Sequence, residues 1–223
     1  MVKLTKEQIQ IIDNYLIRKQ VIYADLKLEI LDHMISDIES EMETNQILFD
    51  DAFDKTIVKW KSSFLETSSF WLGLAVMRPK IIISKLTSTL KPLLFKLFIS
   101  TILITVFLFA VDRSFLKINL NNYKENILVI IYVFAALNTL MLAYWAVLMH
   151  RSKIKTSFSF LYYRQVLVCC LYPLFITDTF LFKEGSINFI SLSFIIYTVF
   201  NSLMGRELFK AHFKTSKAIQ KFA

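Results

Sequence analysis

The apolar residues of this chain follow a periodic pattern up to about residue 66 and form long uninterrupted runs from about residue 92 onward. Four runs are almost entirely apolar, and they cover residues 93–111, 127–149, 161–182 and 187–204. An α-helix needs roughly 17 to 25 apolar residues to cross the hydrocarbon layer of a membrane. The four runs therefore predict a transmembrane bundle of four helices, in which Lys183–Ser186 separates the third helix from the fourth.

Residues 1–66, which we call the head, have the spacing of three amphipathic helices, expected near residues 5–19, 23–43 and 48–65. The apolar stripe of the second helix consists of Leu28, Leu31, Ile35, Ile38 and Met42, widened by Ile30 and Met34. In the third helix Trp60 lies on the apolar side, so we expect it at the centre of the core. The predicted fold class is all-α, with a small N-terminal cytoplasmic helical domain followed by a four-helix transmembrane bundle.

Residues 67–91 form a connector that is too apolar to be a flexible linker. Pro79 suits the first turn of a helix, in which Ile81, Ile82, Ile83 and Leu86 are mixed with Lys80, Lys85 and Lys91. This amphipathic composition favours packing at the membrane surface or against the head. A direct extension of the first transmembrane helix fits the same residues equally well.

Charge is unevenly divided along the chain, which carries a net +8. Residues 1–71 contain 8 Lys or Arg against 13 Asp or Glu, whereas residues 72–223 contain 18 against 5. Between the runs, 13 Lys or Arg lie on one side of the predicted membrane and 4 on the other. Because Lys and Arg are retained in the cytoplasm, both termini, the loop at 150–164 and the basic tail at 205–223 should be cytoplasmic. This basic excess suits lipid headgroups, and no nucleic-acid partner is expected.

A row of acidic residues follows one side of the second predicted helix. We call this row the acidic ridge, and it consists of Asp25, Glu29, Asp32, Glu39 and Glu43. A solvated helix face is the simpler interpretation of such a row. A docking surface for a basic protein partner is the interpretation that carries a function, and the ridge is our candidate partner-binding site.

His33 lies one helical turn from both Glu29 and Asp37. A solvated or interface histidine is the expected role. A metal-binding or pH-sensing role is the alternative, although no second histidine is near in the sequence.

Three segments of the head together resemble a known family: Leu28–Met34, Asp37–Glu39 and Phe49–Phe53. They are similar to the HAAS signalling domain, which is associated with PadR-type transcriptional regulators, and to the related prefix domain of some permeases. The resemblance covers about residues 5–60. It implies a signalling or regulatory role in a bacterial cytoplasmic (inner) membrane, with a PadR-like regulator as one candidate partner, and it brings no catalytic residue.

Little in the sequence points to catalysis. The chain has 3 glycines, too few for a glycine-rich phosphate loop, and His33, His150 and His212 are too scattered for a zinc motif. Cys169 and Cys170 are adjacent within an apolar run, where packing is their expected role. We therefore predict that the protein is not an enzyme and needs neither cofactor nor metal.

Two functions remain open at this point. The first is a membrane-anchored regulatory or protein-interaction protein whose head binds a partner. A second copy of the chain is one candidate for this partner. The alternative is a small transporter, channel or accessory subunit of a membrane complex, which would need a polar pathway through the bundle. Asn138 and Asp178 are the candidate intramembrane polar residues for such a pathway, with helix bridging and interfacial solvation as their simpler roles.

The charge distribution predicts the topology. Reporter fusions should read cytoplasmic at Gln46, Lys155 and the C-terminus, and external at Tyr123 and Gly185, because the basic residues gather on the cytoplasmic side. A fusion at Lys155 that reads external would overturn this topology.

Overall fold

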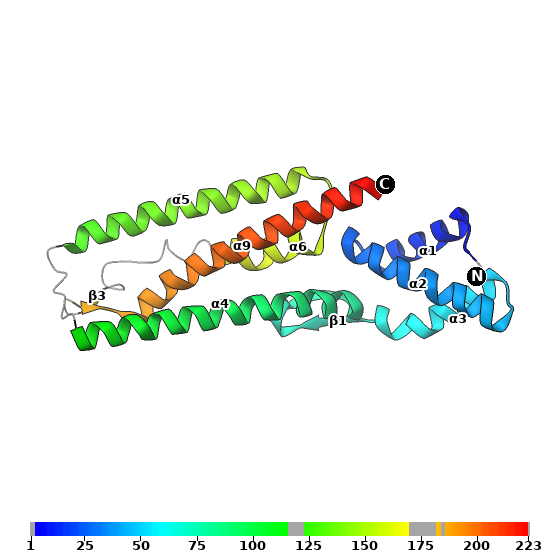
Figure 1. The fold of residues 1–223 in the computed structure, drawn as a ribbon, viewed down its shortest axis with the longest axis horizontal. Coiled ribbons are helices and arrows are strands. Elements are labelled where there is room, and N and C mark those ends of the chain that lie inside the picture. Colours follow the sequence, from blue (N-terminus) through cyan, green and yellow to red (C-terminus); the bar gives the residue numbers. More distant parts are fainter. Residues whose placement is uncertain (1–2, 116–122, 170–181, 184–185, 223) are drawn as a thin grey trace. The chain divides into compact units, whose positions relative to one another are not determined.

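A computed structural model describes residues 3–115, 123–169, 182–183 and 186–222 (Figure 1). The predicted all-α class is confirmed, with two small antiparallel sheets as the only strands among the described residues. The chain forms two compact units. The first comprises Met1–Leu90, Ile154–Ser157 and Thr215–Ala223, and the second comprises Lys91–Lys153 and Phe158–Lys214.

The head contains α1 (Lys6–Arg18), α2 (Ala24–Asn45) and α3 (Phe49–Trp60). A capping box opens α1: the Thr5 hydroxyl accepts a hydrogen bond from the Gln8 amide at 3.3 Å, and the Thr5 amide donates to the Gln8 side chain at 2.8 Å. α2 ends at Gln46, which adopts a left-handed backbone conformation with φ of 50°. Local capping and turn residues thus set these helix ends.

The core of the head is centred on one side of α2, which packs against α1 and α3. Its fully buried residues are Leu26, Ile30, Met34 and Ile38. Leu28, which the sequence placed in the apolar stripe, is instead 43% exposed. The buried side of α2 is therefore rotated from the predicted stripe, and Ile30 and Met34 move from its margin to its centre.

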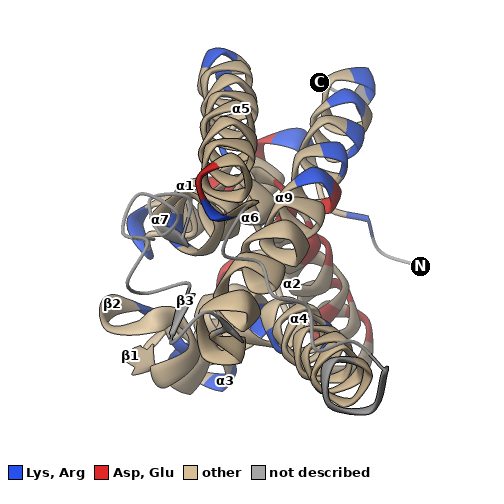
Figure 2. Ribbon diagram, turned by 90° about the vertical axis from the view of Figure 1, so that its left-hand side faces the viewer, with Lys and Arg blue, Asp and Glu red and all other residues tan. Residues whose placement is uncertain are grey.

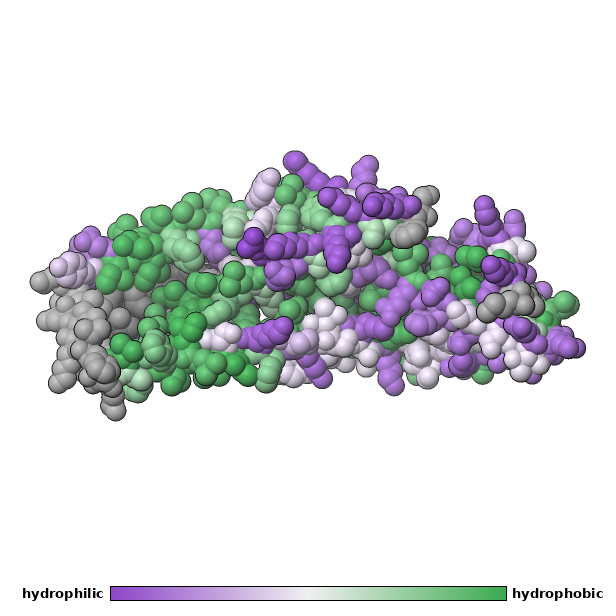
Figure 3. Space-filling model, in the orientation of Figure 1, coloured by the Kyte–Doolittle hydropathy of each residue, from purple (hydrophilic) through white to green (hydrophobic). Residues whose placement is uncertain are grey.

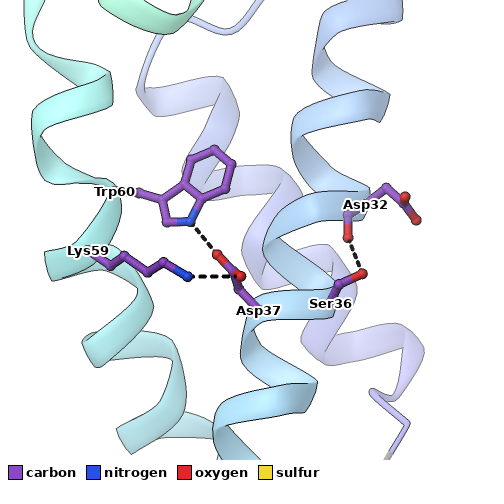
Figure 4. A network of polar contacts seen from close by, with 5 residues as sticks. All are labelled: Asp32, Ser36, Asp37, Lys59 and Trp60. Atoms are coloured by element: carbon purple, nitrogen blue, oxygen red, sulfur yellow. Dashed lines mark hydrogen bonds and ion pairs between the residues drawn. The ribbon is translucent and has the colours of Figure 1, made fainter.

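Trp60 is not the centre of this core, contrary to the prediction. It is half-buried at the end of α3, just before the 3₁₀ turn η1 (Lys61–Phe64). Its indole N–H donates a hydrogen bond to Asp37 at 2.7 Å (Figure 4), and its ring stacks on Phe64 with centroids 6.0 Å apart. A tryptophan with a polar partner is often placed at the edge of a core, where one end of the ring system stays near water.

A β-hairpin occupies the first half of the predicted connector. It consists of β1 (Glu66–Ser69) and β2 (Gly73–Pro79), which are antiparallel and are joined by the 3₁₀ turn η2 (Phe70–Leu72). Gly73 has a φ of 89°, which side chains disfavour, so it allows the chain to reverse there. The sequence did not predict these strands. Directly after Pro79, α4 (Lys80–Phe115) begins and continues as one helix, which is the extension that the sequence left open.

Among the described residues, three helices are long and apolar enough to cross a membrane, by length and composition: Lys80–Val111 of α4, Lys124–Arg151 (α5) and Phe189–Lys221 of α9 (Phe189–Phe222). In Figure 3 apolar side chains gather in the left part of the view, over one end of these helices, and hydrophilic side chains cover much of the rest. The protein is therefore a multi-pass membrane protein. The basic tail predicted after residue 204 belongs to α9, and Figure 2 shows its Lys and Arg residues in blue along that helix.

Most of the third predicted run lies outside the described residues. Its described part consists of α6 (Ser157–Leu161), a π-helical segment η4 (Tyr162–Val166) and α7 (Leu167–Cys169). Further along, β3 (Phe182–Lys183) pairs with β4 (Ser186–Ile187) in an antiparallel arrangement. These two strands lie on either side of the predicted turn, whose residues 184–185 lie outside the described residues.

The rotated core of α2 generates a prediction on stability. Met34→Ala should destabilise the head by about 2–5 kcal/mol because Met34 is fully buried and its removal leaves a cavity. Leu28→Ala is the matched control, and it should change stability by less than about 1 kcal/mol. Hydrogen exchange of residues 6–60 in the full-length protein in detergent measures both. Equal loss of protection in the two variants would contradict this assignment of the core.

Candidate functional site

The acidic ridge lies on the side of α2 opposite the buried residues, at 100° per residue. Asp25, Glu29 and Glu39 each contact a residue of the first compact unit outside α2. The ridge is therefore divided between residues that hold this unit together and residues that face solvent.

Asp25 binds the first residue of α6, directly after the loop at 152–156. One carboxylate oxygen accepts a hydrogen bond from the Ser157 amide at 2.9 Å, and the other accepts from the Ser157 hydroxyl. Ser157 is the first residue of α6 and is buried, so its amide has no partner within that helix. A carboxylate at such an amide forms a charge-assisted hydrogen bond, which is stronger than a neutral one.

The same loop also binds the beginning of α2. Tyr23 precedes α2 without a side-chain cap, and the amide of Ala24 donates to the Lys155 carbonyl at 2.8 Å. The start of α2 thus provides an acceptor for the first amide of α6, and the loop before α6 provides an acceptor for the first amide of α2. We call the contacts Asp25–Ser157 and Ala24–Lys155 the head–loop junction. Neither partner follows from a local sequence motif, because 132 residues separate Asp25 from Ser157.

Tyr23 and Arg78 extend the polar surroundings of the junction. Burial raises the pKa of the Tyr23 hydroxyl, while a hydrogen bond and the charge of Arg78 on β2 oppose this change. Tyr23 is 4% exposed, so it stays neutral in the physiological range. The sequence analysis did not identify either residue, since an isolated Tyr and an isolated Arg form no motif.

Glu29 and Glu39 make the other two internal contacts of the ridge. Glu29 forms an ion pair with Lys85 at the beginning of α4, and their side chains are 40% and 44% exposed. Such an exposed pair contributes little free energy, and its partners exchange readily with other charges in water. Glu39 accepts a hydrogen bond from the Leu4 amide at 3.0 Å, which fixes the chain just before α1.

Asp32 and Glu43 are the exposed residues of the ridge. Figure 4 shows the Asp32 carboxylate directed away from α3, while its backbone carbonyl accepts from the Ser36 hydroxyl at 3.0 Å. A partner protein would therefore meet the ridge first at these two positions.

Asp37 belongs to the opposite flank of α2 and has a structural role. Burial raises its pKa, but hydrogen bonds from Trp60 at 2.7 Å and Lys59 at 3.0 Å outweigh burial and lower the pKa overall (Figure 4). The stability that these bonds contribute is present above the unfolded-state pKa of Asp37 and is lost as pH falls through the lower folded-state value. His33 is exposed and its charge also favours the carboxylate. Among the described residues no group of three His, Cys, Asp or Glu could hold a metal ion.

The second unit contains a buried polar cluster between its helices. The Ser202 hydroxyl of α9 lies 2.7 Å from Asn138 Oδ1 of α5 and 2.9 Å from the Thr198 carbonyl. Asn201 donates to the Val166 carbonyl, at the end of the π-helical segment, at 3.2 Å. Asn138 thus bridges two helices, which was its simpler expected role. Asp178 lies outside the described residues.

Close packing surrounds this cluster. A Cβ added at Gly205 of α9 would lie 2.8 Å from Val166 Cγ1, 3.2 Å from Leu142 and 3.3 Å from Tyr162. The Tyr162 hydroxyl donates to the Leu142 carbonyl at 2.7 Å. Small residues and interhelical hydrogen bonds of this kind hold transmembrane helices together. The cluster therefore serves helix packing and leaves little room for a ligand at Gly205.

A buried histidine near the end of α5 escaped the sequence analysis. His212 is fully buried, and its Nε2 lies 2.9 Å from the Ser152 hydroxyl. Ser152 follows α5 and donates to the Met149 carbonyl at 2.7 Å, so it caps the helix. The surrounding sequence did not indicate burial, because His212 lies among the basic residues of the tail.

The head–loop junction generates a prediction on coupling. Asp25→Asn and Ser157→Ala should each reduce hydrogen-exchange protection of residues 154–161 in the full-length protein in detergent. The double variant should lose less than the sum of the single losses, with a coupling free energy of about 1–3 kcal/mol, because both changes remove the same bonds. Asp32→Asn is the control and should have no effect there. Strictly additive losses would show that Asp25 and Ser157 do not interact.

In comparisons with protein-family models, curated proteins and solved structures, nothing matches the chain. The resemblance of residues 5–60 to the HAAS domain therefore stays a prediction.

Proposed function

We propose that this is a membrane-anchored regulatory protein whose cytoplasmic head binds a basic protein partner through the acidic ridge. In this proposal the protein lies in a bacterial inner membrane, with both termini and the loop at 150–164 in the cytoplasm. A PadR-like regulator is the candidate partner that the resemblance implies, and a second copy of the chain is another. The charge distribution supports the topology.

The observation that carries the proposal is the head–loop junction. Asp25 at the start of the ridge binds Ser157, which is the first residue of α6 and directly follows the loop that connects α5 to α6. The loop is covalently continuous with both helices. A change in the bonds of Asp25 therefore changes the restraint on a segment that continues directly into the membrane part.

Partner binding and these internal contacts use the same charges. Asp32 follows Asp25 by two helical turns, which is about 10 Å along α2, so a basic surface docked on Asp32 also reaches Glu29. The partner's cations would compete with Lys85 for Glu29. Because the Glu29–Lys85 pair is exposed, it contributes little free energy and is easily replaced. The partner can release the loop from Asp25 only if it binds more tightly to the head with the loop released. Competition of its cations for Glu29 and Asp25 provides that difference in affinity.

The described part of the bundle gives less support to the transport alternative. Asn138, Asn201 and Ser202 are buried there and carry no formal charge, and the buried His212 contacts Ser152 at the end of α5. Asn138 and Ser202 contact each other, and Asn201 contacts a backbone carbonyl. Asn138 Nδ2 and Asn201 Oδ1 have no hydrogen-bond partner among the described residues, but an ion pathway usually involves ionisable residues or aligned carbonyls.

The proposal predicts which acidic residues capture a partner. Asp32→Lys with Glu43→Lys should abolish co-purification of the basic proteins that accompany the wild-type chain in mild detergent, because the exposed part of the ridge changes sign. Added salt should weaken the same capture. Quantitative mass spectrometry of the purified complexes measures both effects.

The matched control is Asp51→Lys with Asp54→Lys, which makes the same change of charge at exposed positions of α3. This control should retain the partner. The proposal fails if both double variants lose the same proteins, or if neither loses any, since capture would then not depend on the ridge.

A further inference from the structure

A cleft of about 530 Å³ lies between α4 and α9 in the second unit. Its walls are mainly apolar, with Leu93 and Leu97 from α4 facing Phe200 and Leu203 from α9. The two helices are antiparallel neighbours, because Phe98 contacts Tyr197 at a centroid distance of 5.8 Å and Phe109 contacts Phe189 at 5.1 Å. Apolar chains of lipid or detergent are the natural occupants of such a groove in a membrane-spanning part.

Two basic residues line the same cleft, one from each helix. Lys96 lies within the first apolar run, three residues after its start, and Arg206 lies two residues after the end of the fourth run. Since α4 and α9 are antiparallel, both residues belong to the same edge of the apolar region, which is the cytoplasmic edge on the predicted topology. Both are exposed, and among the described residues neither forms an ion pair.

Glu207 is the acidic residue at the cleft, and its charge has a nearby partner. Its carboxylate lies 3.6 Å from the Lys210 ammonium, one turn further along α9. The pair is exposed, and it leaves Lys96 and Arg206 as an excess of positive charge beside an apolar groove. An ammonium group near the edge of the hydrocarbon needs either water or an anion as its partner.

We propose that this cleft binds an anionic phospholipid. Lys96 and Arg206 bind the phosphate, and one acyl chain lies along Leu97, Phe200 and Leu203. Arg matches a phosphate through paired N–H donors, while Lys supplies a point charge, so the two residues complement each other at one headgroup. Basic pockets between transmembrane helices on the cytoplasmic side suit anionic headgroups in general. A free phosphate would use the cations but not the apolar walls.

Native mass spectrometry of the full-length protein in detergent tests the proposal. Phosphatidylglycerol should bind in at least one tight equivalent, and phosphatidylcholine with the same acyl chains should bind roughly tenfold more weakly, because it lacks net charge. Lys96→Gln with Arg206→Gln should remove that preference. The matched control, Lys214→Gln with Lys217→Gln, removes the same charge from exposed positions of α9 outside the cleft and should keep it.

Two further experiments distinguish a phospholipid from a free phosphate and test the apolar cleft separately from its charges. Glycerol phosphate should not compete at concentrations where phosphatidylglycerol saturates, and effective competition would overturn the lipid assignment in favour of a free phosphate. Ser100→Phe fills the cleft while it keeps both cations, so it should also weaken phosphatidylglycerol binding. Unchanged binding in this variant, or equal loss in the charge variant and its control, would overturn the proposal.

Discussion

The first compact unit depends on the need of two helix starts for hydrogen-bond partners. The first amides of an α-helix have no acceptor within the helix, and a buried amide without a partner is costly. In α6 the Asp25 carboxylate satisfies this need at Ser157, and in α2 the Lys155 carbonyl does so at Ala24. Because each contact joins the head to a loop between membrane helices, a local requirement of the backbone becomes a connection over a long distance in the sequence.

In the membrane part, polar contacts between helices also stabilise the fold. Apolar side chains gain little by leaving lipid for a helix interface, so close packing and interhelical hydrogen bonds must hold the bundle together. Gly205 permits a close approach to Val166 and Leu142, and the nearby Ser202 bonds to Asn138. The π-helical segment presents the Val166 carbonyl to Asn201 in the same region. Small and polar residues here are explained by packing before any transport role is considered.

The sequence predicted those features that depend on neighbours along the chain. The capping box at Thr5, the three helices of the head and the long apolar helices all follow from local spacing. The hairpin at residues 66–79 was missed because its first strand is polar and its pairing depends on the turn at Gly73. The prediction that Trp60 lies at the centre of the core was wrong for a related reason. Periodicity shows which side of a helix faces the core, but the depth of the ring depends on its hydrogen bond to Asp37 on another helix.

The candidate site shows the same limit more sharply. Periodicity placed Asp25, Glu29 and Asp32 on one side of α2 but could not show that Ser157 and Lys85 occupy the first two. An acidic row selected for docking and one selected for internal bonds have the same spacing, so the sequence alone cannot distinguish them. The structure assigns internal bonds to Asp25, Glu29 and Glu39, whereas Asp32 is exposed to solvent. A partner must then either dock beside those bonds or replace them, and replacement is what would link docking to the membrane part. An acidic surface whose residues were all exposed could bind a partner without affecting the loop, whereas in the proposed function the ridge would couple partner binding to the loop through shared charges.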